Sequence, residues 1–162
     1  NGEFTVNVAL IRRGKPVAGI IYAPVKDVLY HAVQGKGAYK IEGGRTSRLP
    51  DEDGSGTLTV AGSRSHGTRE FEEYVQGLRE RYGEVSLVSA GSSLKFCLVA
   101  EGLAHIYPRF GPTMEWDTAA GQVIVEEAGG RVVKAGGARP LEYNKENLLN
   151  PHFIAFRGDQ YA

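Results

Sequence analysis

The chain has 162 residues, of which 41% are hydrophobic, and its 19 Lys and Arg balance 19 Asp and Glu. This balance excludes a basic face for nucleic acid and a cationic surface for membrane adsorption, and no apolar run approaches the length of a membrane span. A chain of this length can bury roughly 70% of its unfolded surface in a core.

The single cysteine, Cys97, excludes an internal disulfide and a metal site made of several cysteines. Its apolar neighbours predict a buried and unreactive thiol. Cysteine usage of this kind fits a reducing compartment, so we expect a cytoplasmic protein, free or at the inner face of the membrane.

The first 50 residues predict a series of strands joined by turns. Phe4, Val6, Val8 and Leu10 alternate with other residues, which is the period of a strand with one apolar face. Further strands are expected at 17–22, 28–33 and 38–41. The pattern indicates an antiparallel meander whose apolar face needs a cover. No helix is expected in this segment, so the cover of the meander is missing. The chain also enters a strand almost at once, and we therefore expect it to begin within a larger domain.

A polar linker at 51–56 separates this segment from one in which strands and helices alternate. We therefore expect two units: residues 1–50, strands of an incomplete antiparallel sheet domain, and residues 57–158, an α/β domain. The expected strands of the second unit are 57–61, 85–89, 103–107, 131–133 and 153–156, and the expected helices are 68–82, 92–101 and 117–128. In an open α/β sheet, ligands bind beyond the carboxyl ends of the strands.

Three polar segments lie where that rule places a ligand: residues 62–66, residues 91–95, and residues 108–109 with the loop to Asp117. Together they offer serines, a lysine, an arginine and a histidine around one carboxylate. Such a set suits a phosphorylated ligand with a divalent cation.

Each candidate residue also has a purely structural interpretation. Ser92 either caps its helix or contacts a ligand. Lys95 lies in a first helical turn, where the helix dipole disfavours a cation, so a nearby anion is the better explanation. Arg109 could be an ordinary surface charge, and His66 alone is a weak signal. Asp117, at or beside the start of its helix, is either a cap or a metal ligand.

Several motifs of the chain resemble the 3'(2'),5'-bisphosphate nucleotidases, the CysQ branch of the inositol monophosphatase superfamily. The Trp-Asp-x-Ala-Ala-Gly element at 116–121 is typical of the superfamily, while Ser-Ser-Leu-Lys at 92–95 and Tyr-Pro-Arg at 107–109 favour the nucleotidase branch. The segments 1–7, 63–66 and 99–102 match as well, so the resemblance runs through nearly the whole chain.

The resemblance implies a layered α/β sandwich and a magnesium-dependent, lithium-sensitive phosphatase. Its substrate would be adenosine 3',5'-bisphosphate, a small phosphorylated nucleotide that loses its 3'-phosphate to metal-activated water, with the sulfated relative as a further substrate. By the matching motifs, Asp117 would be a catalytic residue and ligand of Mg2+, and the nucleotide would be held by His66, Ser92, Lys95 and Arg109.

One departure from the family pattern concerns the metal. The family's other ligands come from a Glu-Glu element and an Asp-Pro-x-Asp-Gly-Thr element, which we expect to precede Asn1, and the chain contains no Asp-Pro. The pairs Glu72-Glu73 and Glu126-Glu127 fall inside expected helices, where solvated helix faces explain them. Because Mg2+ needs several oxygen ligands, we expect this polypeptide alone to be inactive.

Two alternatives remain open. The chain could belong to another phosphatase of the superfamily, acting on inositol phosphate or a sugar bisphosphate. It could also be a non-catalytic nucleotide-binding module. The oligomeric state is not set by the sequence, although a bare apolar sheet face and an unpaired strand edge favour association.

Overall fold

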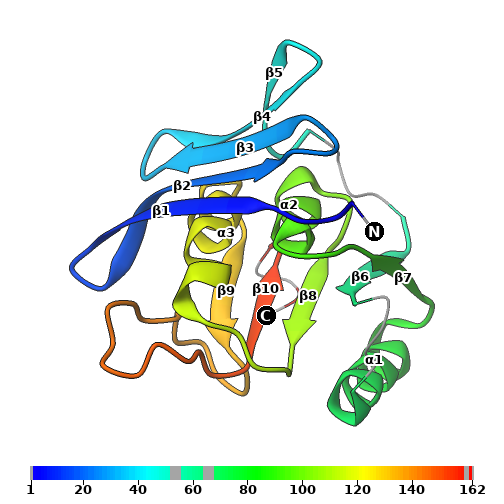
Figure 1. The fold of residues 1–162 in the computed structure, drawn as a ribbon. Helices are drawn as coiled ribbons and strands as arrows, with labels where there is room; N and C mark the ends of the chain where they lie inside the picture. Colours follow the sequence, from blue (N-terminus) through cyan, green and yellow to red (C-terminus); the bar gives the residue numbers. More distant parts are fainter. Residues whose placement is uncertain (1, 52–55, 64–67, 159–160, 162) are drawn as a thin grey trace.

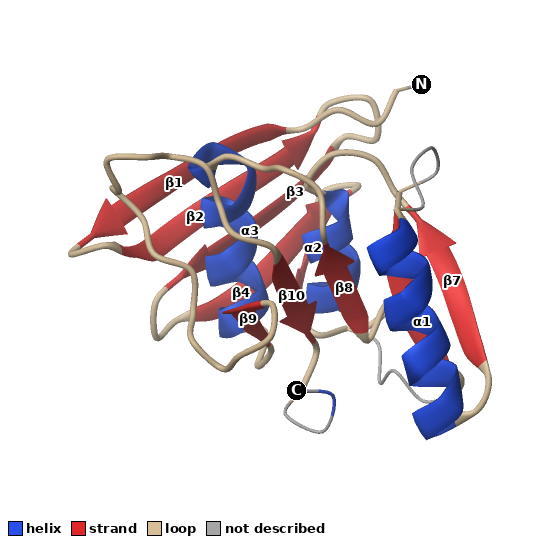
Figure 2. Cartoon of the chain, turned by 90° about the horizontal axis from the view of Figure 1, so that it is seen from below, coloured by secondary structure: helices blue, strands red, loops and turns tan. Residues whose placement is uncertain are grey.

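The computed structural model describes residues 2–51, 56–63, 68–158 and 161, which form two five-stranded sheets with two helices packed between them (Figure 1). Figure 2 shows the same layers from below, with a third helix at the side of the second sheet. The expected α/β layered sandwich, with a meander followed by a mixed sheet, is confirmed.

The first sheet is an antiparallel meander in chain order. Its strands are β1 (Val6–Arg12), β2 (Lys15–Ala23), β3 (Val28–Val33), β4 (Gly37–Glu42) and β5 (Arg45–Arg48). The strand β5 was not expected from the sequence, because its four residues are all polar. It pairs with β4 through a two-glycine turn in which Gly43 and Gly44 both have positive φ, the backbone of a tight hairpin.

The inner face of the meander is covered by the helix α3 (Glu115–Glu127), so the expectation of a missing helical cover is wrong for this face. The helix and the sheet lie close together at Gly19, where an added Cβ atom would lie 2.8 Å from the Cα atom of Ala120. The small residues of the Trp-Asp-x-Ala-Ala-Gly element therefore allow helix and sheet to touch. The opposite face carries exposed apolar side chains: Val6, Val8, Leu10, Ile20 and Val33.

The second sheet is mixed. Its strands are β6 (Leu58–Gly62), β7 (Val85–Ser89), β8 (Ile106–Arg109), β9 (Arg131–Lys134) and β10 (Phe153–Phe156), in the order β7-β6-β8-β10-β9. The strand β6 runs parallel to β7 and β8, and the two remaining pairs are antiparallel.

The third strand of this sheet begins later than the sequence suggests. It was expected at 103–107 but spans Ile106–Arg109, because the helix α2 (Leu94–Glu101) ends in a turn that includes the next residues. Gly102 adopts a left-handed conformation, and the amide of Ala104 still donates to the carbonyl of Leu98. The shift makes Arg109 the last residue of the strand.

The helices α2 and α3 share one core with both sheets, whereas α1 (Arg69–Tyr82) packs on the far face of the second sheet. Thr68, expected as the first helical residue, instead caps α1 with its hydroxyl, and Gly83 ends the helix directly after its expected last residue. Ile21 of the first sheet and Phe153 of the second belong to the same buried cluster. The division into units 1–50 and 57–158 stays a prediction.

Candidate active site

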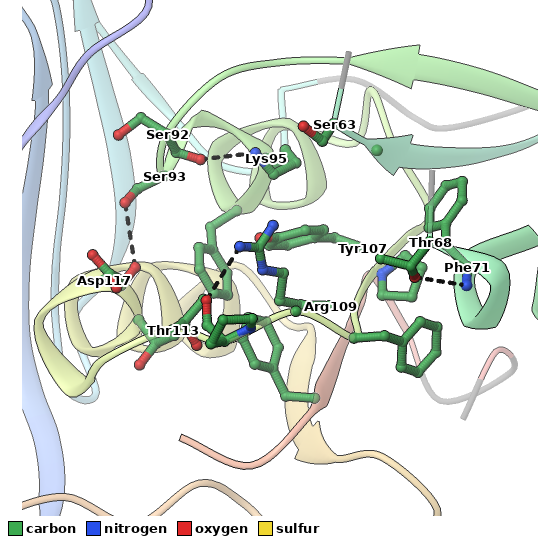
Figure 3. Close-up of a pocket in the computed structure, with 18 of the residues that line it drawn as sticks. Ser63, Thr68, Phe71, Ser92, Ser93, Lys95, Tyr107, Arg109, Thr113 and Asp117 are labelled. Atoms are coloured by element: carbon green, nitrogen blue, oxygen red, sulfur yellow. Dashed lines mark hydrogen bonds between the residues drawn. The ribbon is translucent and has the colours of Figure 1, made fainter. Parts of the chain in front are cut away.

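A cavity of about 550 Å³ lies beside the carboxyl ends of β6 and β8 and the start of α2 (Figure 3). It is lined by residues of all three polar segments, among them Ser63, Ser92, Lys95, Arg109 and Asp117. The expectation that the three segments converge is therefore confirmed for these residues. His66 lies outside the described residues.

Lys95 is a buried cation, with only 5% of its surface exposed, in the first turn of α2. Its ammonium donates to the carbonyl oxygens of Ala90, at 2.9 Å, and of Ser92, at 3.0 Å. It also lies 5.5 Å from the centre of the Tyr107 ring. Burial, together with repulsion from Arg109, lowers the pKa of Lys95 to about 8, and Glu3 opposes this shift. Among the described residues only neutral carbonyls accept hydrogen bonds from this charge, so an anion in the cavity would stabilise it.

Arg109, at the end of β8, lines the same cavity (Figure 3). One of its terminal nitrogens donates to the carbonyl of Pro112 at 3.3 Å, while its Nε is buried and has no hydrogen-bond partner among the described residues. A buried donor without an acceptor is costly, and a ligand oxygen would remove that cost. An ordinary surface charge does not explain this geometry.

Ser92 and Ser93 form the turn before α2. Ser92 has φ +48°, a backbone conformation that residues other than glycine rarely adopt. Its hydroxyl is 2.6 Å from that of Thr5, and the N-cap residue of α2 is Ser93, so the capping interpretation of Ser92 is wrong. Ser93 accepts a hydrogen bond from Asn7 and donates to the carbonyl of Asp117 at 3.3 Å.

Asp117 was expected at or beside the start of its helix, but it is the third residue of α3, whose N-cap residue is Met114. Its Oδ2 atom accepts a hydrogen bond from the Met114 amide at 2.8 Å. The carboxylate therefore does satisfy an amide at the helix start, although it reaches back from inside the first turn. The same side chain lines the cavity, and its role as a metal ligand stays a prediction.

Aromatic rings form the apolar part of the cavity wall. Tyr107 packs edge-on against Phe96, with ring centres 5.1 Å apart. Phe71 belongs to α1 (Figure 3), and the ring centre of Phe110 lies 5.6 Å from that of Tyr74 in the same helix. Sequence reasoning did not assign Phe71 or Phe110 to the site. Phe71 falls within the expected helix 68–82, and Phe110 gives no signal beyond its position next to Arg109.

The glutamate pairs excluded as metal ligands have different environments. Glu72 and Glu73 are exposed on α1, as expected. Glu127 is partly buried, and a solvated face does not fully explain it, because its two carboxylate oxygens accept the amides of Gly35 and Gly37 at 2.8 Å each. It joins the end of α3 to the turn between β3 and β4. Cys97 is buried, as expected, and burial raises the pKa of its thiol well above the ordinary value.

The described part of the chain contains no group of three or more His, Cys, Asp or Glu side chains that could hold a metal ion. Asp117 alone offers one carboxylate, and magnesium prefers an octahedral set of oxygens. The described residues therefore do not fit a complete magnesium site. They also include no helix that is long and apolar enough to cross a membrane.

Residues 1–157 match the model of the inositol monophosphatase family. The 3'(2'),5'-bisphosphate nucleotidase CysQ of Escherichia coli K12 is 52% identical over 154 residues, which cover 94% of this chain and 60% of the relative. The protein of the same name from Buchnera aphidicola is 46% identical, covering 96% of this chain and 57% of the relative. The chain thus spans about 60% of the length of the curated relatives that it matches.

Solved structures agree with these matches. The crystal structure of CysQ from Bacteroides thetaiotaomicron, described as a bacterial member of the inositol monophosphatase family, superposes with a TM-score of 0.92 at 50% identity. The match covers 96% of this chain and 63% of that one. SuhB of Mycobacterium tuberculosis superposes with a TM-score of 0.69 at 26% identity, over 96% of this chain and 59% of that one.

Proposed function

Because the chain belongs to the inositol monophosphatase family, we propose that its cavity is the nucleotide-binding part of a 3'(2'),5'-bisphosphate nucleotidase. The substrate would be adenosine 3',5'-bisphosphate, which loses its 3'-phosphate by hydrolysis. One observation carries the proposal: a buried ammonium and a buried guanidinium Nε without a partner among the described residues line the same cavity.

A ligand with two phosphates and an aromatic base fits this wall. The cations Lys95 and Arg109 would hold phosphate oxygens through charge-assisted hydrogen bonds. The rings of Phe71 and Phe110 would contact the base, and stacking on such rings contributes about 1–3 kcal/mol per base. Ser92, and His66 outside the described residues, stay predicted contacts of the ligand.

Magnesium would be the cofactor, and Asp117 would contribute one carboxylate ligand. Since the described residues supply no further cluster of ligands, we derive no catalytic step through the metal. Asp117 has a second effect, because without a cation its negative charge repels a phosphate in the same cavity. We further propose a cytoplasmic location for the protein.

Calorimetric titration of the 162-residue chain with adenosine 3',5'-bisphosphate, adenosine 5'-monophosphate and inositol 1-phosphate tests the proposal. We expect the bisphosphate to bind at least tenfold more tightly than either monophosphate, because only it engages both cations. Equal or tighter binding of inositol 1-phosphate would contradict the nucleotide assignment and favour an inositol-phosphate phosphatase.

The same preparation tests the predicted inactivity. With Mg2+ present, we expect no release of inorganic phosphate from the bisphosphate above the rate without protein, although the nucleotide binds. Magnesium-dependent release would show that the predicted incompleteness of the metal site is wrong.

A further inference from the structure

The segment before and at the start of β1 directs alternate side chains toward the loop that precedes α2. Glu3, Thr5 and Asn7 are partly buried, while the residues between them, Phe4 and Val6, are exposed. This alternation is the period of an extended chain, so the three polar side chains share one face. We call Glu3, Thr5 and Asn7 the polar row.

The polar row contacts three consecutive residues of the loop. The carboxylate of Glu3 accepts the amide of Gly91 at 2.8 Å. The hydroxyl of Thr5 is 2.6 Å from that of Ser92, and Asn7 donates to the hydroxyl of Ser93 at 2.8 Å. One extended segment therefore fixes a turn that lies 86 to 88 residues away in sequence.

The turn needs such support, for two reasons. Ser92 holds a left-handed conformation at φ +48°, which costs energy for a residue with a side chain and persists where the surroundings determine it. A Cβ atom on Gly91 would lie 2.7 Å from the Cβ atom of Glu3, so segment and loop also pack as closely as glycine allows. Hydrogen bonds and packing thus act on the same residues.

The supported turn in turn holds the cation of the cavity. The carbonyl groups of Ala90 and Ser92 accept hydrogen bonds from the ammonium of Lys95. These two residues lie on either side of Gly91, whose amide donates to Glu3. The hydroxyl of Ser93 extends the connection to the carbonyl of Asp117 in α3. A shift of the turn would therefore move Lys95.

We propose that the polar row positions the site: Glu3, Thr5 and Asn7 hold residues 90–93, with Ser92 in its left-handed conformation, and thereby place the Lys95 ammonium for the ligand phosphate. The role in ligand binding rests on the proposed function. The role in holding the turn does not.

The experiment compares variants of the 162-residue chain by amide hydrogen exchange without ligand and by calorimetry with adenosine 3',5'-bisphosphate. Glu3→Ala should speed exchange at Gly91 and weaken binding, each roughly tenfold, because a buried amide loses its acceptor. Glu3→Gln should restore both to within about threefold, since its amide oxygen still accepts. Thr5→Val should speed exchange at residues 92 and 93 and provides a second variant if Glu3→Ala does not fold.

Matched controls come from the same segment. Val6→Thr and Val8→Thr change side chains that are 51% and 58% exposed on the opposite face, so loop exchange and affinity should stay unchanged. Glu3→Ala should add little to the loss of affinity in a Lys95→Met background, because the row acts through Lys95.

Unchanged exchange at 91–93 in Glu3→Ala and Thr5→Val overturns the proposal, and so does a full additive loss of affinity in the double variant. If the unaltered chain does not bind the bisphosphate, the proposed function fails. In that case the exchange rates alone decide whether the polar row holds the turn.

Discussion

Lys95 places a buried ammonium in the cavity, and among the described residues only neutral carbonyls accept its hydrogen bonds. Lys95→Met keeps the length of the side chain and removes the charge. We expect the Kd for adenosine 3',5'-bisphosphate to rise about 10- to 100-fold, the effect of one or two charge-assisted hydrogen bonds. Lys36→Met, at an exposed lysine, is the control. An equal loss for a simple phosphate ester would remove Lys95 from nucleotide recognition.

The lowered pKa of Lys95 also predicts a pH dependence. The protonated amine attracts phosphate. Burial, and to a smaller extent repulsion from Arg109, lowers the pKa of this amine to about 8. Affinity should therefore be full below this value and fall as the pH rises through it, with a limiting slope of about tenfold per pH unit. The dependence should disappear in Lys95→Met. Calorimetry between pH 6 and about 10 measures both, and a slope that persists in the variant would assign the titration to another group.

Asp117 has a structural and an electrostatic effect that substitutions can separate. Asp117→Asn keeps an acceptor for the Met114 amide, so the free energy of unfolding should change little, whereas Asp117→Ala should lose about 1 kcal/mol. Without magnesium, Asp117→Asn should bind the bisphosphate several-fold more tightly, because a negative charge leaves the cavity. Urea unfolding and calorimetry measure the two effects. Weaker binding by Asp117→Asn would indicate that the carboxylate accepts a hydrogen bond from the ligand.

The helix α3 holds Asp117 in place through close contacts with its neighbours. A Cβ atom on Gly121 would lie 2.4 Å from ring atoms of Phe96, so Gly121→Ala should lower the free energy of unfolding by about 1–3 kcal/mol. Gly77→Ala in α1 is the matched control, because no atom outside the adjoining helix backbone and its two chain neighbours lies within 4 Å of its Cβ position among the described residues. There alanine should stabilise by about 0.5–1 kcal/mol through the helix backbone. The free energy of unfolding of both variants is measured by urea unfolding. A change of the same sign for Gly121→Ala and Gly77→Ala would contradict the packing argument.

The elements that the sequence predicted well are apolar runs between turn residues. The strands Val28–Val33, Val85–Ser89 and Phe153–Phe156 have the expected bounds. The strand β5 was missed because its four polar residues carry no apolar pattern and take their strand conformation from pairing with β4. The start of α3 was misplaced because Asp117 caps backwards from the first turn, which no residue at the N-cap position indicates.

For the site as well, features that depend on local sequence could be predicted, and contacts between distant residues could not. The rule for the carboxyl ends of strands predicted the convergence of Lys95, Arg109 and Asp117, since each follows or ends a recognisable element. The contacts of Glu3 with Gly91 and of Glu127 with Gly35 could not be predicted. Each joins residues about 90 positions apart, and no local pattern specifies the partner.

At the scale of the whole molecule, the layer of α2 and α3 joins the two sheets, and the cavity opens where these parts meet. None of the described residues that line the cavity belongs to the first sheet, which instead supports the elements that do. Its inner face packs on α3, and the polar row before and within β1 contacts the turn before α2. Movement of this sheet relative to α2 would disturb the binding site directly.

The outer face of the same sheet predicts association of the chain in solution. Val6, Val8 and Leu10 are 51%, 58% and 62% exposed on β1, which is the edge strand of the sheet among the described residues. An exposed apolar edge strand favours pairing between molecules, and charged side chains on it oppose pairing. We expect the unaltered chain to sediment partly as oligomers and the double variant Val8→Lys, Leu10→Lys to shift to the monomer. Leu103→Lys, at an apolar residue 47% exposed after α2, should leave the distribution unchanged. A fully monomeric unaltered chain would show that this face does not drive association.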